Sequence, residues 1–143
     1  MQRPDGPELG SVMGMGDEDV RLRFGEPMSA RTIGGEDWLV YSADNWRLRL
    51  RLSAPRSGGH PVVRSCTLEL GDGGSDLKRL LSRVGLAATG VIDSAPESGG
   101  ALLRCETRLG GRPASVTANV RDGAIAAISV FDEAPDWPGW TAP

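Results

Sequence analysis

Residues 46–52 read Trp46-Arg47-Leu48-Arg49-Leu50-Arg51-Leu52, an unbroken alternation of apolar and charged side chains. Side chains of a β-strand point to opposite faces with a period of two, so the tryptophan and the leucines share one face and the arginines share the other. A shift of one residue would bury guanidinium groups and expose leucines, which specifies the register strongly. The stretch predicts a half-buried antiparallel strand.

The residues on either side of this strand predict its neighbours. Asp44-Asn45 is suited to a two-residue turn that joins the strand to an earlier one at 38–43. With that turn, Tyr41 lies opposite Leu48 on the apolar face, and Trp38 lies opposite Arg51 on the charged face. A further strand is expected at 63–70, after a loop rich in glycine and proline.

Two short helices are expected, one before each group of strands. Residues 17–24 begin with three acids and stop at Gly25, which suits the helix macrodipole and a glycine stop. Residues 77–84 carry leucines at helical spacing, with Ser75 as the expected N-cap.

The later strands are also placed by their turns. Gly110-Gly111 predicts a hairpin between 101–109 and 112–120, with Cys105 opposite Val116. For the last turn, the hydrophobic pattern favours a three-residue loop at 121–123 with a G1 bulge, which would place Val116 opposite Ile128.

These elements predict an α+β fold, with an antiparallel sheet of about six strands and two short helices on one face. The order of elements suggests tandem helix-plus-three-strand units at 16–70 and 75–131. Residues 1–15 are expected to form a flexible N-terminal arm with at most one short helical turn. Residues 16–133 would then be a single domain, and 134–143 a tail rich in proline and tryptophan.

Composition narrows the classes of protein. The net charge of -3 over 143 residues argues against a nucleic-acid partner, and no apolar run is long enough for a membrane span. The N-terminus lacks the apolar region of a signal peptide, so a soluble, cytoplasmic protein is expected, with a clipped mature form as the alternative. Cys66 and Cys105 are expected to be small apolar core residues, with a disulfide as the alternative.

A second pattern, Gly14-Met15-x4-Val20-x3-Phe24-Gly25-x-Pro27 followed by Trp38 and Tyr41, resembles the bacterial SmpA/OmlA outer-membrane assembly lipoproteins. It is also similar to the related β-lactamase-inhibitor-protein-like superfamily. The lipoproteins carry a lipidated cysteine that this chain lacks, so envelope assembly is not carried over. The resemblance implies a non-catalytic module that presents a sheet face to another protein.

The residues themselves support no catalytic chemistry. The single histidine, His60, sits in a Gly/Pro loop and cannot build a triad or a metal site with other histidines or a cysteine pair. Gly71-x-Gly73-Gly74 has Asp76 where a dinucleotide-binding loop needs glycine. We therefore expect no catalytic residue, no cofactor and no metal, with an enzyme of unfamiliar type as a remote alternative.

The leading hypothesis is a protein-interaction or assembly module: a subunit, inhibitor or accessory factor. Its expected partner-binding residues share planar or aromatic groups that suit protein interfaces, and they are Arg47, Arg49, Arg51, Trp38, Trp137 and Trp140. Arg64, Arg104 or Arg108 could extend the arginine row. The alternatives are a solvated face balanced by local acids, and a small-ligand module whose pocket is lined by Trp38, Tyr41 or Trp46. For the two tail tryptophans, the alternative is docking on the protein's own sheet or helix.

Overall fold

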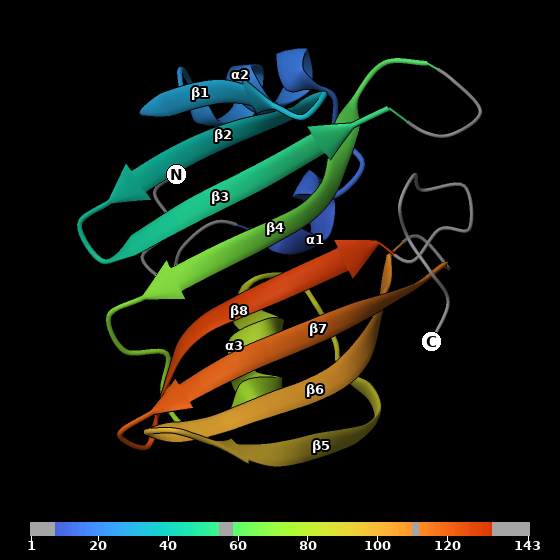
Figure 1. Cartoon of the computed structure of the whole chain (residues 1–143). Helices are drawn as coiled ribbons and strands as arrows, with labels where there is room; N and C mark the ends of the chain where they lie inside the picture. Colours follow the sequence, from blue (N-terminus) through green and yellow to red (C-terminus); the bar gives the residue numbers. More distant parts are fainter. Residues whose placement is uncertain (1–7, 55–58, 110–111, 133–143) are drawn as a thin grey trace.

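The computed structural model describes residues 8–54, 59–109 and 112–132, and these form one eight-stranded antiparallel sheet with three short helices (Figure 1). The strands lie in the order β1-β2-β3-β4-β8-β7-β6-β5. The helices are α1 (Leu9–Val12), α2 (Asp17–Phe24) and α3 (Leu77–Arg83). The strands are β1 (Ser29–Ile33), β2 (Glu36–Ala43), β3 (Trp46–Ser53), β4 (Val62–Leu70), β5 (Thr89–Glu97), β6 (Gly100–Leu109), β7 (Arg112–Arg121) and β8 (Ala124–Asp132).

The expected α+β class with an antiparallel sheet is confirmed, but the expected six strands and two helices are wrong. The two strands that the sequence did not reveal, β1 and β5, are the two edges of the sheet. In β1 every residue after Ser29 is exposed, so no apolar alternation marks it. In β5, Gly90 and Pro96 are residue types typical of a loop, although an edge strand tolerates both. The helix-plus-three-strand units are therefore wrong as well, because four strands follow α2 and four follow α3.

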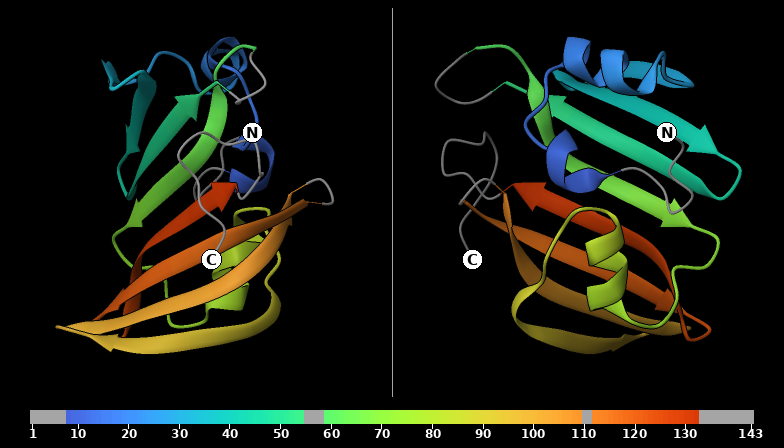
Figure 2. Two further views of the ribbon diagram at one scale, coloured as in Figure 1. Left: turned by 45° about the vertical axis from the view of Figure 1, so that its right-hand side comes forward. Right: turned by 180° about the vertical axis from the view of Figure 1, so that it is seen from behind.

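All three helices cover the same face of the sheet: they lie behind it in Figure 1 and in front of it in the rear view of Figure 2. The core fills the space between these layers. Leu48, Leu50 and Leu52 of β3 are fully buried there, as are Leu9 of α1 and Val20 of α2. The opposite face of the sheet is covered by no described element.

The hairpin registers expected for β2–β3 and β6–β7 are confirmed. Tyr41 lies opposite Leu48, and Cys105 lies opposite Val116. The last turn is different from the expected one. It is a two-residue turn at Asp122-Gly123, both with positive φ, and the extra residue is accommodated inside the strands, where the register shifts between Asn119 and Val120.

Because of that internal bulge, the expected pairing of Val116 with Ile128 is wrong. Val116 lies opposite Val130, and Ala118 lies opposite Ile128. The apolar residues still reach the core face, because one extra residue restores the alternation wherever along the hairpin it is inserted.

The helix ends are largely as expected. Helix α2 spans the expected residues 17–24 and stops at Gly25, whose φ of 87° favours glycine. The N-cap of α3 is Asp76 rather than Ser75, and its carboxylate accepts a hydrogen bond from the Arg79 amide at 3.3 Å.

Residues 9–15, part of the expected N-terminal arm, include the helical turn α1 and connect the end of α3 to the central strand β4. The Leu9 amide donates to the Val84 carbonyl at 2.7 Å, at the end of α3. The Gly14 amide donates to the Val63 carbonyl at 2.9 Å, at the start of β4. The segment therefore bridges α3 and β4.

Candidate functional site

The uncovered face of the sheet carries the arginine row. Because the intervening leucines of β3 are fully buried, Arg47, Arg49 and Arg51 project to the face that none of the described helices covers. The expected outward orientation of all three arginines is confirmed.

Two of the three arginines pair with acids on neighbouring strands. Arg49 forms an ion pair with Glu69 of β4. Arg51 forms one with Glu36 of β2 at 2.6 Å and donates to the Ser65 hydroxyl at 3.0 Å. Arg47 lies opposite Glu69 in register, yet within the described residues it makes no ion pair. Local acids therefore balance part of the row, as one of the alternatives anticipated.

Trp38 lies in the middle of a cross-strand row on this face. It is directly opposite Arg51 of β3 on one side and Arg31 of β1 on the other. The indole is half-buried, and Val40, two residues along β2, is half-buried too. Arg31 is exposed and, among the described residues, makes no ion pair. The sequence did not reveal Arg31 as part of the face, because β1 itself has no strand pattern.

The same face continues across the centre of the sheet with small polar side chains and one aromatic ring. Phe131 of β8 lies opposite Ser65 of β4 and Ser115 of β7, and about a third of its surface is exposed (36%). Arg64, a suggested extension of the row, does not belong to it. The Arg64 side chain is buried and pairs with Asp132.

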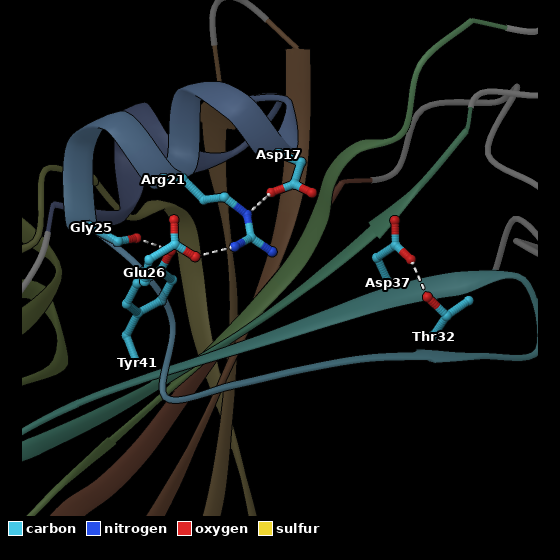
Figure 3. A network of polar contacts seen from close by, with 7 residues as sticks. All are labelled: Asp17, Arg21, Gly25, Glu26, Thr32, Asp37 and Tyr41. Atoms are coloured by element: carbon cyan, nitrogen blue, oxygen red, sulfur yellow. Dashed lines mark hydrogen bonds and ion pairs between the residues drawn. The ribbon is translucent and has the colours of Figure 1, made fainter.

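The remaining expected site residues lie elsewhere or outside the description. Trp137 and Trp140 lie outside the described residues. Tyr41 and Trp46 lie on the helix side of the sheet, opposite to Trp38, so the three aromatics line no common pocket. Tyr41 is buried, packs its ring against Phe24 with centroids 5.4 Å apart, and donates its hydroxyl to the Gly25 carbonyl at 2.8 Å (Figure 3).

The acids of α2 have a structural role. Asp17 pairs with Arg21 at 2.5 Å, and Arg21 also contacts Glu26, as Figure 3 shows. The hydrogen bond that the Arg21 guanidinium donates to the Asp17 carboxylate raises the pKa of Arg21. His60 is exposed and borders a hollow beside the start of α2. In the part of the chain that the structure describes, no group of three or more His, Cys, Asp or Glu residues could hold a metal ion.

Both cysteines are buried and free, as expected for core residues. They lie on β4 and β6, three strand spacings or about 14 Å apart, which is too far for a disulfide. Burial raises the pKa of Cys66 to about 12, so its thiol stays protonated at neutral pH. Burial also raises the pKa of Cys105, and the charge of Glu106 adds to the effect.

The architecture is thus an antiparallel sheet with helices on one face and an open face bearing arginines and Trp38. A cysteine-rich secretory protein from Staphylococcus aureus subsp. aureus Mu50 has a similar fold, with a TM-score of 0.55 and 8% sequence identity. The match covers 90% of this chain and 48% of that one, so this chain spans about half the length of its structural neighbour. At that identity the likeness shows the fold alone.

No family model matches the sequence, and a comparison with curated proteins finds no match either. The resemblance to the SmpA/OmlA lipoproteins and the β-lactamase-inhibitor-like proteins therefore stays a prediction. Across the described residues, no helix has the length and apolar character that crossing a membrane would require.

Proposed function

We propose that this chain is a non-catalytic protein-interaction module, and that its partner docks on the open face of the sheet over β1–β4. The observation that carries the proposal is the position of Trp38. A half-buried indole stands between two arginine side chains on a rigid sheet, on the face that the described helices leave open. Tryptophan and arginine are the residue types that most often dominate the energy of protein interfaces.

The dimensions of the face suit a protein partner. The whole face is about 34 Å wide, because its eight strands lie about 4.8 Å apart, and strands such as β3 are roughly 25 Å long. The part over β1–β4 is half of it, on the order of 400 Å², which is the area of a small, transient protein interface. A small molecule would cover only a fraction of it.

The charges on the face define the chemistry of the partner. Arg31 and Arg47 have no ion pair within the described residues, so their guanidinium groups are available to carboxylates of another protein. Arg49 and Arg51 already pair with Glu69 and Glu36. They contribute mainly through contacts of their aliphatic stems and planar guanidinium groups. The partner surface is therefore acidic, with an apolar group that meets Trp38 and Val40.

Trp137 and Trp140 complete the proposal as a second contact made by the C-terminal tail. The tail follows Asp132 at the end of β8, which is a central strand of the same sheet. Insertion of these indoles into the partner would bury apolar surface that is otherwise unfavourable in water.

The proposal is tested by affinity capture from native extract followed by mass spectrometry. The variant Arg31→Gln/Arg47→Gln removes the two arginines of β1–β4 that lie on the open face and form no ion pair with any described residue. We expect it to lose a stoichiometric acidic protein that the unaltered chain retains. The matched control, Lys78→Gln/Arg79→Gln, removes two exposed charges from α3 on the covered side and should retain that protein.

The captured protein should also depend on the original arginine row. The triple change Arg47→Gln/Arg49→Gln/Arg51→Gln should leave the circular dichroism spectrum intact, because all three side chains lie on the solvent side of β3. If every stoichiometric partner survives both the double and the triple change, the open face is not the docking surface.

A further inference from the structure

A hollow of about 420 Å³ lies at the far end of the same open face, beside β5. It forms where the pairing of β5 with β6 is interrupted. Thr89 lies opposite Glu106 and Asp93 lies opposite Arg104, so three residues of β5 stand against Cys105 alone. The extra length bulges outward at Gly90, whose φ is 75°, and leaves Val91 79% exposed.

The hollow opens on the face away from the helices. Its β6 and β7 walls are Arg104, Glu106, Ser115 and Thr117, which alternate with the buried residues Cys105 and Val116. Those two buried residues also line the hollow. The hollow is thus separated from the helix layer and from the core by the sheet itself.

The polar side chains form two rows across the strands. Glu106 lies opposite Ser115 in the first row, and Arg104 lies opposite Thr117 in the second, with Asp93 across from Arg104 on β5. The rows are two residues apart, or about 7 Å. The hollow therefore offers a carboxylate and a hydroxyl at one end, and a guanidinium and a hydroxyl at the other.

These charges are not neutralised by one another. In the described part of the chain, none of Asp93, Arg104 and Glu106 forms an ion pair, although Asp93 stands directly opposite Arg104. The three side chains together carry a net charge of about −1 at neutral pH, from two carboxylates and one guanidinium. A ligand that satisfies all three carries one anionic and two cationic groups.

We propose that this hollow binds a basic α-amino acid of the lysine class. The ligand carboxylate pairs with the Arg104 guanidinium and accepts from the Thr117 hydroxyl, since arginine matches a carboxylate in geometry as well as charge. Its two ammonium groups pair with Glu106, beside Ser115, and with Asp93. The volume of the hollow falls within the range of roughly 300–1,000 Å³ that is usual for small-ligand sites.

Other ligand classes fit the hollow less well. A phosphate or nucleotide would meet two carboxylates for one guanidinium. An apolar ligand would leave those charged groups without partners as it excluded water. The hollow lies on β5, β6 and β7, which β8 separates from β4, so this site is independent of the proposed docking of a protein on β1–β4.

The test is a titration of the isotope-labelled full chain with lysine. Binding is monitored through the amide NMR signals of Gly90, Val91, Ser115 and Thr117. We expect those signals to shift and saturate at millimolar lysine. Cadaverine lacks the carboxylate and norleucine lacks the side-chain ammonium, and each should bind about tenfold or more weakly, because each loses one charged pair. A short peptide ending in lysine lacks the free α-ammonium group and should bind more weakly than lysine itself, whereas equal binding would overturn the assignment of that group to Asp93.

Three variants assign the contacts. Arg104→Gln should abolish the preference for lysine over cadaverine, and Arg104→Lys should restore part of it. Glu106→Gln should weaken lysine binding and leave norleucine binding nearly unchanged. Arg79→Gln, at an exposed position of α3 on the other side of the sheet, is the matched control and should leave the titration unaltered.

A well-dispersed spectrum of each variant shows that it is folded. Lysine, cadaverine and norleucine giving equal shifts, or no saturation up to about 50 mM lysine, would overturn the proposal. The bulge in β5 would then serve only to protect an exposed sheet edge from pairing with other chains.

Discussion

The guanidinium of Arg64 lies 3.1 Å from the carboxylate of Asp132, and both side chains are almost completely buried. The pair joins β4 to the end of β8. These are the two adjacent strands at which β1–β4 meet β5–β8 in the sheet. A buried ion pair contributes little net stability compared with an apolar pair of the same shape, but removal of one partner leaves a buried charge without its counter-ion.

We therefore expect Asp132→Asn to lower the free energy of unfolding by about 3–5 kcal/mol, measured by urea denaturation. Arg64→Met/Asp132→Leu removes both charges at similar volume and should be less destabilising than the single change. A single variant as stable as the original chain would show that the pair is solvated.

Gly10 of α1 packs against Gly85, which follows the last residue of α3 by two positions, so closely that no larger residue fits at position 10. A Cβ atom at position 10 would stand 2.2 Å from the Gly85 carbonyl oxygen. Gly10→Ala should therefore push α1 away from α3 and cost about 1–3 kcal/mol of stability. Thermal unfolding measures this, with Gly71→Ala as the control, because a Cβ at position 71 meets nothing within 4 Å. Equal effects of the two changes would show that α1 does not pack as described.

Alkaline pH should destabilise the fold through Cys66. Burial raises the pKa of this thiol in the folded chain from 9.0 to about 12, so the unfolded chain loses its proton first as pH rises. The contribution is complete below about pH 9 and is lost progressively as the pH rises toward 12. Burial raises the pKa of Tyr41 as well, and acts in the same direction.

Urea denaturation at about pH 8 and about pH 10 measures this loss, because the slope of stability against pH reports the difference in bound protons. Cys66→Ala lowers stability at both pH values by leaving a small cavity, but it should reduce the difference between them. An unchanged difference in the variant would assign the alkaline loss to other groups.

The hydroxyl of Tyr41 fixes the end of α2 over the sheet. Tyr41→Phe keeps the ring contact with Phe24 and removes only the hydrogen bond to the Gly25 carbonyl. We expect a loss of about 0.5–1.5 kcal/mol in the free energy of unfolding. Tyr41→Ala, which also removes the ring, should cost about 3 kcal/mol or more. Similar losses for both would mean that the ring contributes nothing.

Sequence reasoning succeeded where one face of a strand is buried and the other is wet. In β3 every leucine is buried, and the register of the β2–β3 hairpin follows from that alternation and from the Asp44-Asn45 turn. It failed at the sheet edges. Edge strands such as β1 contact one neighbour only, so burial imposes no pattern on their residues.

The site residues that the sequence did not reveal were missed for the same reason. Arg31 was missed because β1 was missed, and the hollow beside Asp93 was missed because it depends on a bulge in β5. The sequence predicts the extra residue of the last hairpin in its turn, whereas the register shifts between Asn119 and Val120. The hydrophobic pattern requires one extra residue but does not fix its position. The docking role of the face is a prediction that the sequence suggested and that only an experiment can test.

Hydrogen–deuterium exchange of the chain alone and with its captured partner tests the docking role of the open face most directly. Edge strand β1 pairs with β2 alone and is the part of the proposed surface most free to exchange. The account predicts slower exchange at residues 29–33 in the complex and unchanged exchange at residues 77–83 of α3. Slower exchange at 77–83 with none at 29–33 would place the partner on the helix side and contradict it.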